Sequence, residues 1–124
     1  MSNDAEVLSA ADVLGLIEKA EWRRLENGHS SGFCGSTSII LVGNVDGSTA
    51  QLTQKYCEDG PGAEAHFYYY ASIYRNGARI GHLGVCYSND PSDDPYQLRE
   101  LFERHKSNFT TRMTKEVREN TTSR

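Results

Sequence analysis

The sequence lacks any long apolar run, and this limits the class of protein it can be. The longest uninterrupted aliphatic stretch is Ile39–Val42, whereas a membrane-spanning helix needs roughly 20 apolar residues. The N-terminal segment Met1–Glu6 contains two acidic residues and no apolar core of a secretory signal. We therefore expect a cytoplasmic protein with no transmembrane segment and no membrane partner.

Cysteine is scarce. The chain has three cysteines, an odd number, and they are widely spaced. A disulfide-stapled domain is therefore not predicted. The spacings C-x-x-C and H-x-x-x-H, which mark most zinc sites, are also missing. This leaves only weak candidate ligands, namely Cys57, His66, His82 and Cys86, and we expect no metal and no cofactor.

The remaining cysteine, Cys34, lies in the small-residue segment Gly32-Phe33-Cys34-Gly35. A thiol in such a loop is a candidate nucleophile if a histidine activates it. The candidate bases are His29, His66 and His82. Spacing identifies no Asn or Asp that would orient the base, and most free thiols are unreactive. We expect a protein that is not an enzyme, and keep a Cys34 thiol enzyme as the third alternative.

The chain also lacks an excess of positive charge. It carries 13 Lys and Arg against 17 Asp and Glu, for a formal net charge of −4. This balance argues against indiscriminate binding to nucleic acid, although the local field on one face decides such binding.

An N-terminal helix is indicated by a capping pattern followed by helical periodicity. Ser9 with Asp12 resembles a capping box, and apolar residues recur at helical spacing from Val13 to Leu25. The pattern predicts a helix from Ser9 to about Asn27, and Gly28 is a plausible stop signal.

The single tryptophan lies off the apolar stripe of this predicted helix. Trp22 projects roughly opposite Val13, with Arg23 and Arg24 beside it. An indole is costly to leave in water, so Trp22 is expected to have a partner. That partner is either a sheet edge or second copy of the chain, or a nucleobase on which the ring stacks.

Strand-like runs follow. Four are predicted, at Ser38–Val42, Thr49–Cys57, Ala65–Tyr74 and Ala78–Tyr87. The segment Asn44–Ser48 is predicted to be a turn. Asn76-Gly77 between the last two runs is the strongest short signal for a hairpin with a type I′ turn, and that turn would pair Arg75 with Ala78.

Counting outward from this turn divides the hairpin into two faces. We take one face as the core, and it carries Phe67, Tyr69, Ala71, Ile73, Ile80, His82 and Cys86. The other face is expected to be exposed. It is rich in hydroxyls and rings, contains no acid, and carries His66, Tyr68, Tyr70, Ser72, Tyr74, Arg79, Gly81, Leu83, Val85 and Tyr87.

A second helix is predicted after a turn-rich linker. Asp94 is a good N-cap, Pro95 suits the first helical position, and Gln97 completes a capping box. Apolar residues then recur at helical spacing from Leu98 to about Val117. The EF-hand pattern is absent, so capping and linking explain the nearby carboxylates Asp90, Asp93 and Asp94.

The predicted fold is α+β, with an N-terminal helix, a four-stranded antiparallel sheet and a C-terminal helix. Both helices are expected on one face of the sheet, with the other face open. We expect a flexible N-terminus at 1–8, a single domain at 9–119 and a frayed tail at 120–124.

The order of several short motifs resembles the RNA-silencing suppressors of the tombusvirus and aureusvirus group of plant viruses. Glu21-Trp22-Arg23 on an early helix precedes Gly32-Phe33 and a strand; a Tyr-rich hairpin interrupted at Arg75-Asn76-Gly77 and a helix from Pro95 follow. The resemblance implies a viral homodimer whose joined sheets cradle duplex RNA. It also implies that Trp22 caps a duplex end.

The expected function is therefore the non-enzymatic binding and sequestration of double-stranded RNA by a homodimer that suppresses RNA silencing. Duplex RNA is read through phosphates and 2′-hydroxyls, which suits a face of hydroxyls and rings. The roles expected are end stacking by Trp22 with support from its neighbouring arginines, phosphate contacts near the hairpin tip, and sugar contacts. The residues expected to bind RNA are Trp22, Arg23, Arg24, Ser72, Tyr74, Arg75 and Arg79.

The leading alternative is a protein-binding inhibitor or adaptor module. Tyrosine provides contact area at low entropic cost to protein as well as to nucleic acid, and the net charge of −4 favours a protein partner. A salt-insensitive interaction would identify this alternative.

Overall fold

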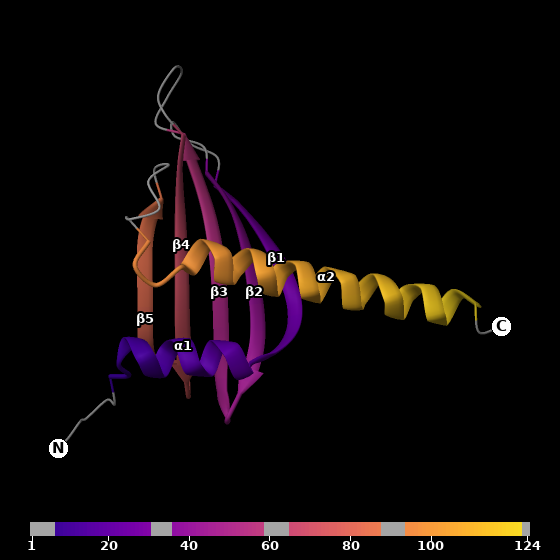
Figure 1. The fold of residues 1–124 in the computed structure, drawn as a ribbon, viewed down its shortest axis with the longest axis horizontal. Coiled ribbons are helices and arrows are strands. Elements are labelled where there is room, and N and C mark those ends of the chain that lie inside the picture. The colour runs from indigo at the N-terminus through magenta and orange to yellow at the C-terminus, as the bar shows by residue number, and fades with distance from the viewer. Residues whose placement is uncertain (1–6, 31–35, 59–64, 88–93, 123–124) are drawn as a thin grey trace.

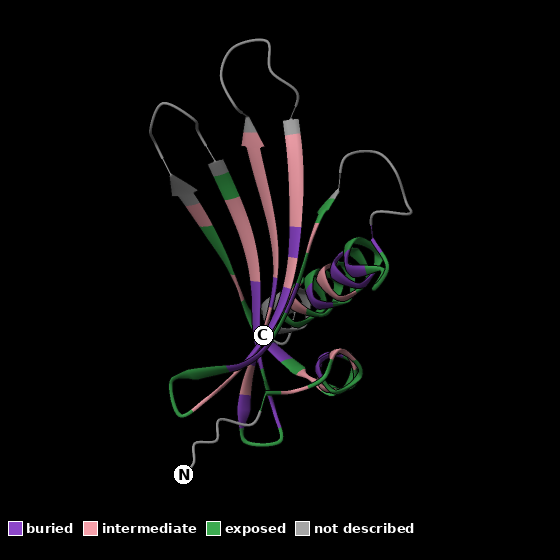
Figure 2. Ribbon diagram, turned by 90° about the vertical axis from the view of Figure 1, so that its left-hand side faces the viewer, coloured by how far each residue is buried: buried purple, intermediate pink, exposed green. Residues whose placement is uncertain are grey.

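The computed structural model describes residues 7–30, 36–58, 65–87 and 94–122. In chain order the elements are α1 (Ala10–Lys19), β1 (Glu21–Ser30), β2 (Ser36–Val45), β3 (Ser48–Glu58), β4 (Ala65–Arg75), β5 (Ala78–Tyr87) and α2 (Leu98–Thr122). The strands form one antiparallel sheet in the order β1-β2-β3-β4-β5. Both helices lie on the same face of this sheet (Figures 1 and 2). The α+β class and the open sheet are confirmed, but the sheet has five strands instead of the predicted four.

The N-terminal helix starts where the sequence predicts and ends earlier. The Ser9 hydroxyl accepts a hydrogen bond from the Asp12 amide at 3.1 Å, and Val13 and Ile17 are completely buried. The helix ends at Lys19, because Ala20 already has an extended backbone. The predicted continuation to about Asn27 is wrong. In the described part of the chain, neither α1 nor α2 combines the length and apolar composition needed to cross a membrane.

The fifth strand, β1, occupies the segment predicted to be helical. It pairs with β2, and its register shifts between Trp22 and Arg24. This bulge lets Trp22 and Leu25, three residues apart, face the same side of the sheet. A spacing that indicates a helix therefore also fits a bulged strand. Pairing with the edge of β2 satisfies its backbone groups and outweighs the local helix preference.

The two hairpin turns have the conformations that their sequences demand. Asp46 and Gly47 have φ angles of 48° and 77°, and Asn76 and Gly77 have φ angles of 52° and 82°. Two consecutive positive φ angles define a type I′ turn, whose twist matches that of the flanking strands. The predicted pairing of Arg75 with Ala78 is confirmed.

A second bulge changes the faces of β5. Tyr74 pairs with Arg79, but Ile73 pairs with Gly81, so Ile80 is an extra residue in β5. Beyond a bulge, every side chain moves to the opposite face from the one expected by counting.

The predicted faces of β5 beyond the bulge are therefore wrong. His82 and Cys86, predicted in the core, are on the exposed face. Leu83 is buried and Val85 partly buried on the helix side. Gly81 is also on that side, and a Cβ there would lie 2.6 Å from Val13. The predicted faces of β4 are confirmed, with Tyr69, Ala71 and Ile73 in the core.

The start of α2 uses the predicted cap in a different geometry. The Asp94 carboxylate accepts hydrogen bonds from the amides of Leu98 at 2.8 Å and Arg99 at 3.0 Å. The helix begins at Leu98, and the residues predicted to be its first turn form a turn before it. Gln97 has a φ angle of 55°. Asp94 is thus confirmed as a cap, but Pro95 at the first helical position and Gln97 in a capping box are wrong.

The core lies between the helices and the sheet. Its fully buried large side chains are Val13, Ile17, Leu41, Leu52, Ile73, Leu98 and Phe102. Phe109 is the last buried residue of α2 in the part whose side chains are described. Beyond it, α2 extends past the edge formed by β1 (Figure 1). The helices therefore cover one face, and the other face is left as a candidate surface.

Gly43→Ala should destabilise the protein, because Gly43 lies against β1. A Cβ there would lie 2.5 Å from the carbonyl oxygen of Glu21 and 2.9 Å from the Trp22 ring. Overpacking of this kind costs about 1–3 kcal/mol, measurable as a lower midpoint of urea unfolding. Gly15→Ala is the matched control. It meets no atom within 4 Å in α1, and it should raise the free energy of unfolding by up to about 1 kcal/mol and so raise the midpoint. Equal midpoints for the two variants would contradict the packing described.

Candidate nucleic-acid interface

The face of the sheet opposite the helices is built from alternate residues of β2 to β5, and we call it the open face. Its register positions come from all four strands. Their side chains are small, aliphatic, hydroxyl, thiol, amide, aromatic or basic, and none carries a carboxylate. They are Ser38, Ile40, Val42, Asn44, Thr49, Gln51, Thr53, Lys55, Cys57, His66, Tyr68, Tyr70, Ser72, Tyr74, Arg79, His82, Gly84 and Cys86.

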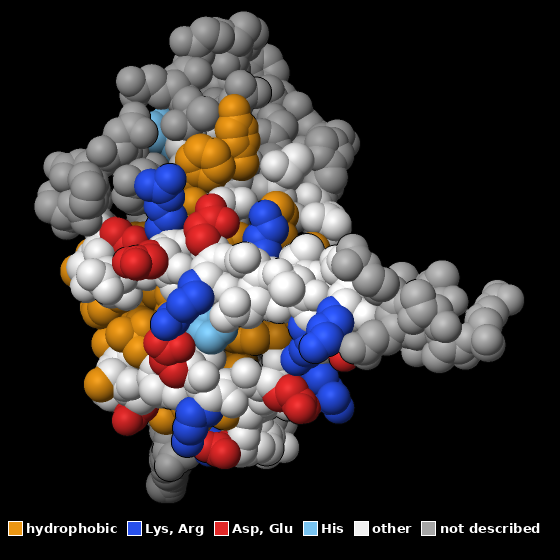
Figure 3. Space-filling model, turned by 45° about the vertical axis from the view of Figure 1, so that its right-hand side comes forward, with side chains coloured by type: hydrophobic (Ala, Val, Ile, Leu, Met, Phe, Trp, Pro, Cys, Tyr) orange, Lys and Arg blue, Asp and Glu red, His pale blue; other side chains and the backbone are white. Residues whose placement is uncertain are grey.

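The described acidic side chains are not among these positions of β2 to β5, although the register places Glu21 and Glu26 of β1 on the same side of the sheet. Those that the structure describes are on the two helices and their caps, on β1 and in one turn: Asp12, Glu18, Glu21, Glu26, Asp46, Asp94, Glu100, Glu103 and Glu116. On the helix side, basic and acidic side chains are intermixed (Figure 3). The open face carries Lys55 and Arg79 with no described acid among its own residues. Its local charge is therefore positive although the chain has a net charge of −4.

A row of rings lies on the β4 and β5 part of the open face. The rings of Tyr68 and Tyr70 are stacked at 6.4 Å with an interplanar angle of 2°. The ring of Tyr70 stacks on that of His82 at 5.6 Å and 24°. Glycine at position 84 makes room for this row, since a Cβ there would lie 2.9 Å from the Tyr70 ring. Three rings on two strands thus form one continuous aromatic surface.

His82 also joins this row to a hydroxyl. The Ser72 hydroxyl and His82 Nδ1 lie 2.8 Å apart, and Ser72 is buried within β4. Desolvation, and then the positive charge of Arg79, lower the pKa of His82 below 6.5. A neutral imidazole at pH 7 can donate one hydrogen bond and accept another. Ser72 and His82 therefore offer paired polar contacts beside the aromatic row.

Three of the predicted RNA-binding residues come together on the open face: Ser72, Tyr74 and Arg79. Arg24 lies on the same side of the sheet in β1 but forms an ion pair with Glu26. Arg23, at the β1 bulge, forms an ion pair with Glu21 at 3.2 Å. These β1 arginines are exposed and partly compensated by their neighbours, so they add less positive charge than the sequence suggests.

The two other predicted residues lie on the helix side. Trp22 is 6% exposed, and its indole N–H donates to His105 Nδ1 at 3.1 Å. The prediction of an outward-facing Trp22 on a helix is wrong, because the residue is on a strand and packs beneath α2. Arg75 donates to the Ser48 hydroxyl at 3.0 Å, so the sheet separates it from Arg79. A buried indole is not presented for stacking on a duplex end.

Sequence reasoning also missed residues of this surface. Lys55 was not singled out, although it lies opposite Tyr68. His82 was assigned to the core because the bulge at Ile80 was not anticipated. Alternation along β3 signals that Gln51, Thr53 and Lys55 share a side. Only the pairing of β3 with β4 shows which side it is.

The candidate metal ligands and catalytic residues do not form a complete site among the described residues. Cys57 lies opposite His66 in the register, but the described residues contain no group of three or more potential metal ligands. Ser72 and His82 have the spacing of a nucleophile and base, yet no described carboxylate on the open face orients the histidine. Cys34, Asp90 and Asp93 are outside the described residues.

Comparisons of the chain with protein-family models, curated proteins and solved structures give no match.

Titration of His82 tests the geometry of the open face. We expect its ring-proton NMR signals to titrate with a pKa below 6.5. Arg79→Gln should raise this pKa, because it removes a positive charge that disfavours the imidazolium. The value should stay below 6.5, since the larger cause, burial against Tyr70 and Ser72, remains. A pKa unchanged by Arg79→Gln would show that the two side chains are not neighbours.

Proposed function

We propose that the protein binds double-stranded RNA on the open face of its sheet and sequesters it without chemical reaction. The observation that carries this proposal is the segregation of charge. In an acidic chain, the open face of β2 to β5 is free of described acids and contains Lys55 and Arg79. An open sheet face of this size with local positive charge suits a polyanion.

The polar groups of the open face match the parts of RNA that a duplex exposes. Duplex RNA offers phosphates and 2′-hydroxyls along a shallow minor groove. Ser72, Thr53 and Gln51 supply hydroxyl and amide partners for such groups, and Lys55 and Arg79 supply cations for phosphates. The tyrosine hydroxyls of Tyr70 and Tyr74 add further donors.

The spacing of the two cations favours an extended ligand. Lys55 lies opposite Tyr68, and Arg79 lies opposite Tyr74, six residues further along β4. At roughly 3.3 Å per residue, this is about 20 Å along the strand. A ligand that contacts both cations must therefore span much of the face, as the backbone of a duplex does.

We further propose that two copies of the chain act together. The strand order makes β1 and β5 the edges of the sheet. Part of the β5 edge is already covered, since the Leu8 amide donates to the Ile80 carbonyl at 2.8 Å. Pairing two copies through a sheet edge would protect that edge and extend the open face. Binding by shape, with no base readout, would suit the suppression of RNA silencing that the sequence resemblance implies.

A protein partner for the same face is the second candidate function. The observation that favours it is the aromatic row of Tyr68, Tyr70 and His82, because rigid tyrosines are common at protein interfaces. Such an interface would depend weakly on salt. A polyanion bound through Lys55 and Arg79 would depend on it strongly.

Binding to a short RNA duplex at several salt concentrations tests the proposal, with the matching DNA duplex as control. We expect retention of the RNA duplex that weakens as salt increases. Lys55→Gln and Arg79→Gln should each reduce the slope of log affinity against log salt by about one. Lys106→Gln is the matched control, because it removes the same charge from α2 on the opposite side and should leave the slope unchanged. No retention at low salt, or equal slopes in all variants, would direct the search to a protein partner.

Trp22→Phe distinguishes the open face from end stacking by the tryptophan. Because Trp22 is buried and bonded to His105, this variant should lower stability and leave the affinity for the RNA duplex unchanged within twofold. Thermal unfolding and duplex binding measured on the same preparation check both expectations. A large loss of affinity in a folded variant would restore the stacking role.

A further inference from the structure

One histidine joins three elements of the fold on the helix side. His105 of α2 accepts the indole N–H of Trp22 from β1 at its Nδ1 atom, at 3.1 Å. Its Nε2 atom lies 3.1 Å from the Glu18 carboxylate of α1. The ring centroids of His105 and Trp22 lie 5.6 Å apart, and the histidine side chain is only 12% exposed. A single imidazole therefore connects α1, β1 and α2.

The identity of these partners determines where the proton of His105 is. An indole N–H can only donate, so Nδ1 must be an unprotonated acceptor. The proton of the neutral ring is then on Nε2, where it faces the Glu18 carboxylate. Both nitrogen atoms are satisfied in this one form. A second proton on Nδ1 would place two N–H groups against each other and remove the bond to Trp22.

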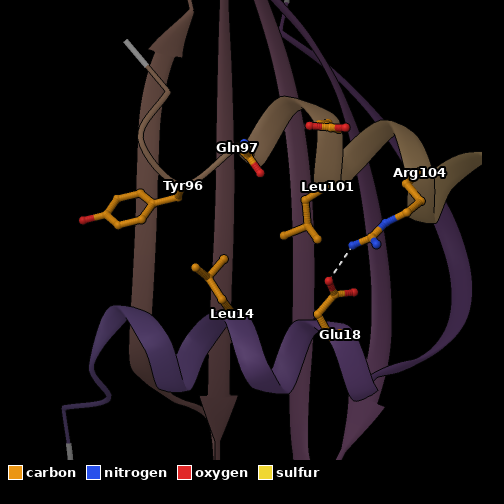
Figure 4. Close-up of a pocket in the computed structure, with 7 residues that line it drawn as sticks. Leu14, Glu18, Tyr96, Gln97, Leu101 and Arg104 are labelled. Atoms are coloured by element: carbon orange, nitrogen blue, oxygen red, sulfur yellow. Dashed lines mark hydrogen bonds and ion pairs between the residues drawn. The ribbon is translucent and has the colours of Figure 1, made fainter. Parts of the chain in front are cut away.

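The charged groups around the ring act in opposite directions. Burial of the ring lowers the pKa of His105 below 6.5, the Glu18 carboxylate raises it, and the Arg104 guanidinium lowers it. Arg104 also binds Glu18 at 2.6 Å, across the gap between α2 and α1 (Figure 4). From β1 the ring meets the uncharged indole of Trp22. Further along α2, beyond the adjacent Lys106, Arg112 donates to the Trp22 carbonyl at 2.5 Å.

We propose that His105 is a proton-operated latch that holds α2 against β1. In the neutral form it binds Trp22 and Glu18 together. In the protonated form it keeps Glu18 through a charge-assisted bond and releases the indole. Arg112 binds the backbone carbonyl of the same tryptophan two turns further along α2. When His105 releases the indole, the part of α2 that leaves the sheet loses one of its two contacts with Trp22 and is held less tightly.

The sign of the pH dependence follows from the direction of the shift. A histidine whose folded-state pKa is below 6.5 stabilises the fold in its neutral form above pH 6.5. That contribution is lost as the pH falls through the lowered folded-state pKa. The latch is therefore closed at neutral pH and opens in mild acid. It does not depend on RNA binding, so it is tested on the protein alone.

The chain contains its own reporter, because Trp22 is the only tryptophan. We expect the fluorescence of Trp22 and its single indole N–H NMR signal to change together, with one midpoint below pH 6.5, while the far-ultraviolet circular dichroism stays constant. His105→Gln should abolish this transition. His82→Asn is the matched control, since His82 lies on the open face and its removal should leave the transition in place.

Glu18→Gln should move the midpoint to lower pH, because it removes the charge that favours the imidazolium. A transition that persists in His105→Gln, or no transition before the protein unfolds, would overturn the latch. If His105→Gln does not fold, the wild-type protein still decides the question. The ring protons of His105 and the indole signal of Trp22 must titrate with one midpoint, and two different midpoints would overturn the proposal.

Discussion

The burial of Trp22 on β1 is the contact on which the arrangement of the helix side depends. A buried indole N–H needs an acceptor, and His105 of α2 provides it. The same imidazole reaches Glu18 of α1, so one chain of polar contacts sets the relative positions of both helices and the edge strand. The glycine at position 43 leaves the space that the tryptophan ring occupies. The apolar core packs around these contacts.

The open face is a consequence of this packing. Successive side chains of a strand point to opposite faces of the sheet. When the two helices bury the side chains on one face, the alternate side chains lie on the other face. The open face of β2 to β5 contains Lys55, Arg79 and a row of rings, and no described carboxylate. The acidic residues whose side chains the structure describes are on the helix side, on β1 and in one turn. The net charge of −4 therefore describes the whole chain and does not predict the local positive charge of the open face.

The two shifted histidines illustrate the different chemistry of the two sides. His82 and His105 both have pKa values lowered mainly by desolvation. His82 shares a surface with a hydroxyl, rings and Arg79, where a ligand has access to it. His105 is enclosed between a carboxylate and an indole, where its protonation affects the contacts between elements. The pKa values of both residues are shifted in the same direction. On the open face this shift affects ligand binding, and on the helix side it affects the docking of a helix.

The features that depend on local chemistry could be predicted from the sequence. These are the capped start of α1 at Ser9, the type I′ turn at Asn76-Gly77, the faces of β4, the capping carboxylate of Asp94 and the α+β class with one open sheet face. From them, Ser72, Tyr74 and Arg79 could be placed together on one surface. Apart from the fold class, each rests on a few neighbouring residues with a strong conformational preference.

The remaining features depend on contacts between distant segments, and two bulges account for most of them. The bulge after Trp22 turns a segment with helical spacing into the fifth strand and buries the tryptophan, because β2 offers an edge whose backbone groups need partners. The bulge at Ile80 exchanges the faces of β5, which brings His82 onto the open face and Leu83 into the core. A bulge is a response to pairing and packing between distant segments. The local sequence on either side of it therefore does not reveal which face a residue will occupy.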